Sequence, residues 1–303
     1  MGATHDELRG RLGRLGAWTF AFDARPAAQV AIDARAIEML GFTVLWVPEG
    51  GGSRDIVGHL GWLLGATERL TVASGIANIT ARRPEVLQAG ATLLADAYGD
   101  RVVLGIGVGH EYTTERRGFG WDRPVARTRA YLDAMDEAAD SWPVPAVPVR
   151  RVLAALGDAM LRLSAERALG AHTYFVSPEH TARARAVLGP EPVLAVEQTV
   201  VLRDEPAEAR AIARNWAVHY LELPNYANNW RRLGFGEDDV TGTGSDRLID
   251  AGIAWGSLDD VVARVRAHLD AGADHVCVQV VSEDDTDVCV PALRELAPAL
   301  LDL

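Results

Sequence analysis

The sequence predicts a (β/α)8 barrel, in which eight parallel strands alternate with helices and close into a ring. Short apolar runs alternate with helical patterns from one end of the 303-residue chain to the other. This unbroken series fits a barrel better than a doubly wound sheet. No composition shift marks a domain boundary, because Pro143, Pro145 and Pro148 form the loop before the fifth strand. We therefore expect residues 1–303 to form a single domain.

Eight apolar runs are the predicted strands. In chain order they span residues 17–22, 43–47, 70–79, 101–108, 151–156, 174–176, 193–202 and 275–281.

Helical patterns follow these strands, and several have recognisable ends. The first begins at Pro26, repeats apolar residues at Val30, Ala34 and Ile37, and stops at Gly41. Later helices begin at Pro84, span residues 160–169, follow the Ser177-Pro178 pair, span 206–220, and run from Ser257 to Ala271. The segment 223–257 is rich in Gly, Asn and Trp, and we expect a helical or irregular insertion there, after the seventh strand.

Composition excludes several functions. All 30 basic residues are arginine, and without a lysine the chain has no Schiff-base, pyridoxal-phosphate or P-loop chemistry. The net charge of −12 argues against nucleic acid as a partner. The two cysteines lack CxxC spacing, so we expect neither a disulfide framework nor a cysteine-zinc site, and we expect a reducing cytoplasm. No apolar run approaches the roughly 20 residues of a membrane span.

In a barrel the active site lies where the strands end. The fourth predicted strand leads into Gly105-Ile106-Gly107-Val108-Gly109-His110-Glu111, whose spacing does not match the GxGxxG dinucleotide fingerprint. Glycines at alternate positions clear one face of a strand. Two interpretations stay open: a flat ring lies against the bare backbone, or the barrel is tightly packed there.

Other strand ends carry polar residues with two interpretations each. Asn78 can hydrogen-bond a loop or a ligand, and Glu49, before three glycines, is either solvated or approached by a ligand. His110 and Glu111 are acid–base candidates by type, although a histidine at a strand end is also a common structural hydrogen-bonding residue. Because HxH, HExxH and GxSxG patterns are missing, we expect neither a metal site nor a serine hydrolase.

Six motifs together resemble the luciferase-like monooxygenase superfamily, and particularly its branch of coenzyme F420-dependent oxidoreductases. The resemblance covers nearly the whole chain. The motifs are LWVPE at 45–49, GIAN at 75–78 with RRP at 82–84, LGIGVG at 104–109, VLAALG at 152–157, SPEHT at 177–181 and AGADHV at 271–276.

The resemblance implies a luciferase-like barrel with a deazaflavin (F420) or a flavin (FMN) across its C-terminal mouth. It implies a bulge with a non-prolyl cis peptide at Gly75-Ile76, and its GIAN motif contributes Ala77 to the cofactor contacts. It places the ring, its ribityl chain and the substrate near these residues: Glu49, Asn78, Gly107, Val108, Gly109 and Tyr112. It places the ribityl chain, the phosphate and the tail of the cofactor near Leu156, Gly157, Asp158, Ser177 and Thr181. A helix N-terminus favours an anion such as this phosphate. Arg82-Arg83, Arg116-Arg117, Arg183 and Arg185 are candidate partners of the phosphate.

The activity that the resemblance implies is hydride transfer between the deazaflavin and a small organic substrate. Relatives that oxidise alcohols carry a catalytic histidine where this chain has Gly50, so His110 or Glu111 is the expected proton donor, with Glu197 a further candidate. The alternatives are an FMN-dependent monooxygenase fed by a reductase and a non-catalytic flavin-binding scaffold. We also expect a homodimer.

Overall fold

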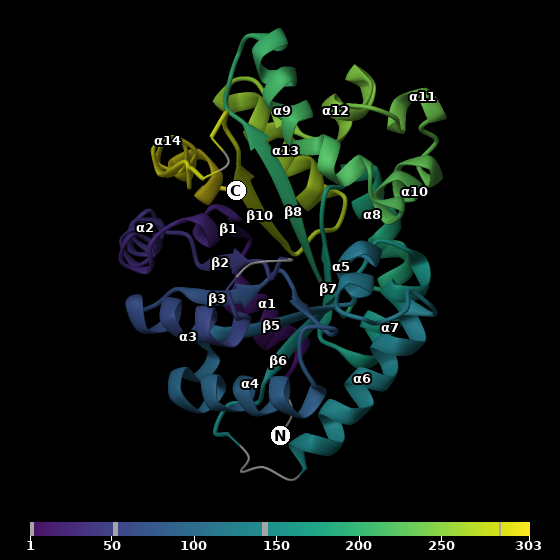
Figure 1. Cartoon of the computed structure of the whole chain (residues 1–303). Helices are drawn as coiled ribbons and strands as arrows, with labels where there is room; N and C mark the ends of the chain where they lie inside the picture. The colour runs from purple at the N-terminus through teal and green to yellow at the C-terminus, as the bar shows by residue number, and fades with distance from the viewer. Residues whose placement is uncertain (1–2, 51–53, 141–144, 285) are drawn as a thin grey trace.

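The computed structural model describes residues 3–50, 54–140, 145–284 and 286–303. Eight parallel strands close a barrel, because the last of them pairs with both the first and the seventh (Figure 1). The barrel strands are β1 (Leu15–Trp18), β2 (Val44–Val47), β3 (Thr71–Ser74), β5 (Val102–Gly107), β6 (Arg150–Ala154), β7 (Gly170–Thr173), β8 (Val193–Val201) and β10 (His275–Val280). Two short strands, β4 (Ala77–Asn78) and β9 (Ala254–Trp255), extend the pairing at β5 and β8. The (β/α)8 prediction is confirmed.

Helices surround the barrel and cover one of its ends (Figure 1). They are α1 (His5–Leu12), α2 (Ala27–Met39), α3 (Ile56–Ala66), α4 (Pro84–Tyr98), α5 (Glu111–Arg116), α6 (Pro124–Ala139), α7 (Asp158–Arg167), α8 (Pro178–Leu188), α9 (Pro206–Leu221), α10 (Pro224–Arg232), α11 (Glu237–Val240), α12 (Asp246–Gly252), α13 (Leu258–Asp270) and α14 (Val290–Leu301), with 3-10 turns at Ala21–Ala24 and Gly99–Arg101. No described helix is both long and apolar enough to cross a membrane.

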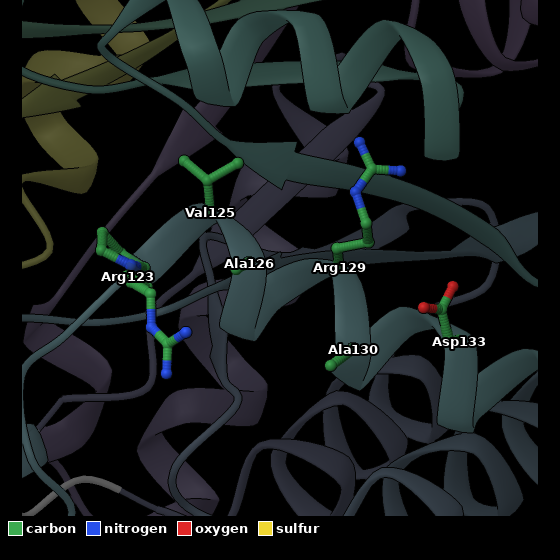
Figure 2. Close-up of a pocket in the computed structure, with 7 residues that line it drawn as sticks. Arg123, Val125, Ala126, Arg129, Ala130 and Asp133 are labelled. Atoms are coloured by element: carbon green, nitrogen blue, oxygen red, sulfur yellow. The ribbon is translucent and has the colours of Figure 1, made fainter.

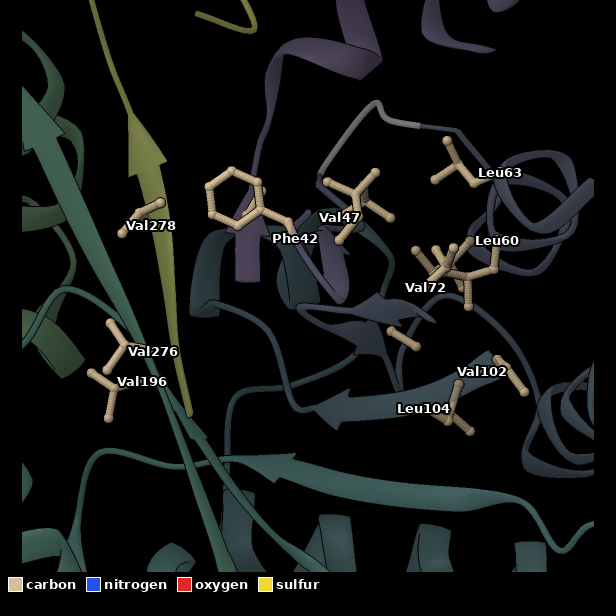
Figure 3. Packing of buried hydrophobic residues seen from close by; sticks show 14 of the residues in the cluster. Phe42, Val47, Leu60, Leu63, Val72, Val102, Leu104, Val196, Val276 and Val278 are labelled. Atoms are coloured by element: carbon tan, nitrogen blue, oxygen red, sulfur yellow. The ribbon is translucent and has the colours of Figure 1, made fainter. Parts of the chain in front are cut away.

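Alternate residues along each strand face opposite sides of the barrel wall. Outward-facing side chains such as Val72 and Leu104 pack with Leu60 and Leu63 of α3 (Figure 3). Inward-facing side chains such as Trp46 and Val103 form a separate buried cluster with Leu8 and Leu12 of α1. Helix α1 therefore closes the N-terminal end of the barrel and leaves the C-terminal end for a site.

Polar rings lie in the middle of the barrel interior. His172 stacks on Trp46 with ring centroids 4.4 Å apart, and Trp46 Nε1 donates to His275 Nε2 at 3.1 Å. Burial lowers the pKa of His172 to about 3 and that of His275 to about 4, so both imidazoles are neutral at pH 7. These rings form a neutral floor beneath the C-terminal mouth.

Two predicted strands are misplaced. The first ends at Trp18 rather than at residue 22, because the Thr19 hydroxyl accepts from Ala21 N at 3.1 Å and the chain enters a 3-10 turn. The sixth is β7, four residues before the predicted 174–176; it ends at Thr173, and Phe175 has a left-handed backbone with φ 53° that no strand continues through.

The insertion after β8 is more regular than its composition suggests. Residues 223–257 contain α10, α11, α12 and β9, and their apolar side chains form a buried cluster with α9. The cluster includes Phe175 of the β7–α8 connection, so these helices rest on the C-terminal mouth of the barrel.

The contact between β3 and β5 gives a direct test of the packing. A Cβ at Gly105 would overlap the carbonyl oxygen of Ser74, a backbone atom with no freedom to move aside. Gly105→Ala is therefore expected to cost about 3 kcal/mol or more in the free energy of unfolding. Thermal unfolding followed by circular dichroism measures this.

The matched control is Gly10→Ala in α1, where nothing lies within 4 Å of an added Cβ. It should raise stability slightly, because alanine is the better helix former. Equal melting temperatures for the Gly105→Ala and wild-type proteins would contradict the packing described.

Candidate functional site

A buried ion pair organises the mouth after β2 and β3. The Glu49 carboxylate accepts from Asn78 N at 2.8 Å and from both terminal nitrogens of Arg82, and only 5% of the Glu49 side chain is exposed. Arg82 also contacts Asp55 at 3.0 Å. Both Glu49 oxygens already have strong donors, so this carboxylate fixes the segment after β3 rather than standing free in solvent.

Asn78 is held by its own loop. Its Oδ1 accepts from Thr80 N at 2.9 Å and from Thr80 Oγ1 at 2.7 Å. Gly109, with φ 75°, lies against the Asn78 amide so closely that a Cβ there would overlap it. The structure thus brings Glu49, Asn78 and Gly109 together, and their contact with a cofactor stays a prediction.

The alternating glycines serve packing. A Cβ at Gly107 would meet Ile76 Cδ1 at 2.7 Å and Ala154 Cβ at 3.1 Å. Of the two interpretations of the glycine series, the described contacts favour tight packing inside the barrel. The consequence for the site is indirect, since Gly107 makes room for Ile76. The peptide bond Gly75-Ile76 is cis, as the resemblance implied.

Two buried polar atoms face the backbone of Gly75. A Cβ at Gly75 would lie 2.6 Å from Trp18 Nε1 and 3.3 Å from His172 Nε2. His172 Nδ1 donates to the Ala195 carbonyl at 3.3 Å, so Nε2 carries the lone pair. Within the described residues neither Trp18 Nε1 nor His172 Nε2 has a hydrogen-bond partner. A donor and an acceptor therefore stand unpaired on the floor of the mouth.

Aromatic rings enclose the mouth above this floor. Tyr174 follows β7; its hydroxyl donates to Gln279 at 2.9 Å and lies 2.8 Å from the hydroxyl of Tyr220 on α9. Its ring centroid lies 5.0 Å from that of Trp18 and 6.2 Å from that of Tyr226. Burial raises the pKa of Tyr174 and Tyr220 well above the ordinary value, so both are neutral hydrogen-bonding groups at pH 7.

His110 joins this aromatic wall. Its ring is parallel to that of Tyr112, with centroids 6.1 Å apart, and lies 5.8 Å from that of Tyr226. Burial lowers the pKa of His110, while the Asn225 side chain acts in the opposite direction. Its Nδ1 is buried and unpartnered among the residues that the structure describes. Glu111, the first residue of α5, is exposed.

A second, charged region lies where β6 and β7 end. Gly157 and Ser177 are the N-caps of the packed helices α7 and α8, and neither helix start has a side-chain cap. Asp158 pairs with Arg183 at 3.0 Å. Arg232, the last residue of α10, has its Nη2 3.8 Å from the position of a Cβ at Gly157. Burial and repulsion from Arg183 lower the pKa of Arg232.

Other predicted contacts face the protein itself. Thr181 is fully buried, and its hydroxyl donates to His268 Nδ1 at 2.8 Å, because His268 Nε2 must donate to Oε1 of the Gln198 side chain. Ala77 and Val108 pack in the outer core, and the Leu156 carbonyl accepts from His180 Nε2 at 3.0 Å. For these four residues a cofactor contact stays a prediction, and their described partners are protein groups.

Sequence reasoning missed six residues of the mouth: Trp18, His172, Tyr174, Tyr220, Tyr226 and Arg232. Tyr174 directly follows a strand, so a correct end for β7 would have marked it. Tyr226 and Arg232 lie on α10. The composition of this segment predicts no helix with defined bounds, so it could not show that these two side chains reach the mouth.

Two pockets lie away from these groups. One is lined by residues of the segment 123–133 (Figure 2). Its charged side chains are already paired, Arg123 with Asp122, Arg129 with Glu166 and Asp133 with Arg167. The other lies beside the ends of β8 and β10 and the starts of α13 and α14, with Asp204, Asp287 and Glu295 in its wall.

Comparison with known proteins decides the family. A family model described as "Luciferase-like monooxygenase" matches residues 13–275. The chain belongs to this family. The closed parallel barrel and the cis peptide after β3 are the two structural features that the resemblance implied.

Individual relatives are oxidoreductases. A 5,10-methylenetetrahydromethanopterin reductase of Methanolobus tindarius is 26% identical over 110 residues, which are 36% of this chain and 34% of that protein. The match therefore spans about a third of that relative's length.

Solved structures share the fold over nearly the whole chain. An F420-dependent secondary alcohol dehydrogenase in complex with an F420-acetone adduct has a TM-score of 0.76 and 14% identity, with 95% of this chain and 99% of that chain covered. The oxygenating constituent of 3,6-diketocamphane monooxygenase of Pseudomonas putida, in complex with FMN, has a TM-score of 0.71 and 16% identity, with 94% and 96% covered. These relatives and neighbours are named as a reductase, an F420-dependent dehydrogenase and a monooxygenase component in complex with FMN, and at 14% and 16% identity the two solved structures show the fold.

The Glu49–Arg82 pair supports a stability prediction. Glu49→Gln leaves a largely buried guanidinium with Asp55 as its one carboxylate contact among the described residues, and this should cost about 3 kcal/mol in the free energy of unfolding. Urea unfolding at neutral pH measures the cost.

Glu85→Gln is the control, since Glu85 and Arg83 form an exposed pair of the same type on the next helix start. Its unfolding midpoint should match that of the wild type. A Glu49→Gln midpoint equal to that of Glu85→Gln would show that the buried pair does not hold the mouth together.

Proposed function

We propose that this luciferase-like enzyme is a coenzyme F420-dependent oxidoreductase that transfers a hydride between the deazaflavin ring and a small organic substrate. The observation that supports it most is the unpaired Arg232. This exposed guanidinium forms no ion pair within the described residues, and it lies beside Arg183, the Asp158 carboxylate that pairs with Arg183, and the start of α7, which has no side-chain cap. Adjacent cations with free helix N–H groups suit a phosphate.

The remaining residues fit a cofactor with a planar ring at one end and a phosphate at the other. The phosphate would bind at Arg183, Arg232 and the starts of α7 and α8, and the ring would lie toward Ile76 and Gly109 between the two ends of the mouth. When bound, F420 supplies the hydride chemistry, and the protein supplies binding and orientation. The Trp18–His172 floor and the Tyr174–Tyr220 wall are neutral at pH 7 and would exclude water from the ring.

His110 is the residue that we assign to proton transfer. It faces the mouth with a buried, unpartnered Nδ1, and its lowered pKa makes it a neutral imidazole at pH 7 that can accept a proton there. Glu111, exposed at the start of α5, would serve only a substrate that reaches outward. Relatives that oxidise alcohols carry a catalytic histidine where this chain has Gly50. We therefore assign proton transfer to His110 without assigning an alcohol as the substrate.

An FMN-dependent monooxygenase supplied with reduced flavin by a reductase is the second candidate. The likeness to an FMN-bound monooxygenase structure favours it, and FMN carries a phosphate that the same arginines could bind. A homodimer and a cytoplasmic location belong to both proposals.

Titration with each cofactor tests the proposal. F420 fluorescence should be quenched as the purified protein binds it, while FMN at equal concentration should compete weakly. Turnover is then followed as F420 reduction with a panel of small alcohols and as reduced-F420 oxidation with small enones and imines. Tight binding of FMN with no binding of F420 would overturn the F420 assignment, and binding without any turnover would favour the scaffold.

Arg232 supplies the matching variant. Arg232→Gln should weaken F420 binding about tenfold, the effect of losing one charge-assisted hydrogen bond. Arg231→Gln is the control, because Arg231 is exposed at the same helix end as Arg232 but pairs with Glu237. Equal dissociation constants for the Arg232→Gln and Arg231→Gln proteins would place the phosphate elsewhere.

A further inference from the structure

A buried carboxyl group lies beneath the mouth without a cation. Glu197 faces inward from β8 and has no exposed surface. Its Oε2 accepts from Phe175 N at 3.1 Å, and its Oε1 accepts from Thr199 Oγ1 at 2.7 Å. No arginine contributes to its electrostatics among the described residues. A buried acid held only by neutral donors calls for an explanation.

The group that Glu197 holds is a strained one. Phe175 has φ 53°, a left-handed backbone that a bulky side chain adopts only where its surroundings enforce it. Its amide points at the Glu197 carboxyl group. One hydrogen bond from a rigid barrel strand therefore fixes the backbone where the chain leaves β7.

The helices over the mouth also pack on the side chain of Phe175. Its ring centroid lies 5.1 Å from that of Trp216 and 5.8 Å from that of Tyr220 on α9. It lies 6.0 Å from that of Tyr226 and 5.3 Å from that of Trp230 on α10. We call α9 and α10 the lid. Two residues after Phe175, Ser177 is the N-cap of α8, the helix at the phosphate end of the proposed site.

We propose that Glu197 is a positioning residue: its carboxyl group holds the segment 174–177 and thereby seats the lid over the barrel mouth and fixes the start of α8. Its effect on the cofactor rests on the proposed function, whereas its effect on the lid does not. Glu197 acts through Phe175 and does not itself touch the proposed ring position.

Ionisation of Glu197 would loosen the lid. The titratable groups facing it are Tyr174 after β7, Tyr220 and Tyr226 on the lid, and Cys277 on β10, and burial raises the pKa of all four, so none carries charge at pH 7. Burial also raises the pKa of Glu197 from 4.5 to about 7. An open lid would return that pKa toward 4.5, so the closed lid binds the proton more tightly. Raising the pH toward 7 therefore favours opening, and the effect levels off above 7.

Two substitutions separate geometry from charge. Glu197→Gln keeps an oxygen to accept from Phe175 N and places an amide that can donate to Thr199 Oγ1, but it cannot ionise. Glu197→Leu removes both hydrogen bonds. Glu191→Gln, at an exposed carboxyl before the same strand, is the control.

Near-ultraviolet circular dichroism of the cofactor-free proteins reports the packing of the aromatic side chains, among them Trp216 and Trp230 of the lid. F420 titration reports the site. Between pH 5 and 7 the wild-type and Glu191→Gln signals should change and F420 affinity should fall, both levelling off above pH 7. Glu197→Gln should keep the low-pH signal and affinity throughout. Glu197→Leu should show the loosened signal at every pH, with the F420 dissociation constant raised about tenfold.

Wild-type pH dependence retained in Glu197→Gln would overturn the proposal, as would identical behaviour of the Gln and Leu variants. If Glu197→Leu does not fold, the comparison of Glu197→Gln with wild type still decides. If no protein binds F420, the proposed function fails, while the dichroism of the cofactor-free proteins still decides the role of Glu197.

Discussion

The site depends on the close approach of β3 and β5. Gly105 lets the Ser74 carbonyl lie where a side chain would stand, and Ser74 Oγ donates back to the Gly105 carbonyl at 2.8 Å. Directly beyond this contact, the cis bond after Gly75 and the short strand β4 carry the chain to Asn78, which rests on Gly109. A side chain at Gly105 would push β3 and β5 apart, and one at Gly109 would displace the Asn78 amide.

From that contact the mouth divides into a neutral half and a charged half. Trp18, His172 and Tyr174 form the neutral half, because burial holds the imidazole and the phenol in their uncharged forms. Arg183 and Arg232 lie in the charged half, where two helices also begin. This separation matches a cofactor with a planar ring at one end and an anion at the other. In this protein of net charge −12, Arg183 and Arg232 place two guanidinium groups at one edge of the barrel.

Much of the fold could be predicted from the sequence, because apolar periodicity reports which residues face a core. The seventh strand and the helices starting at Pro84 and Ser257 match within a residue. The first and sixth strands do not, since Phe22 and Val176 are apolar for reasons of packing in turns rather than strands. In the site, the glycine spacing marked the right strand. It could not tell whether the strand face without side chains is covered by a cofactor ring or by Ile76. The roles of Phe175, Tyr226 and Arg232 depend on contacts between elements far apart in the chain, which local patterns do not encode.

A crystal structure of the protein with F420 bound is the most direct test of this account. It should show the deazaflavin ring against Ile76 and Gly109, with the phosphate in contact with Arg232 and the start of α7. A cofactor bound instead in the pocket beside the starts of α13 and α14, or with its phosphate away from Arg183 and Arg232, would contradict it.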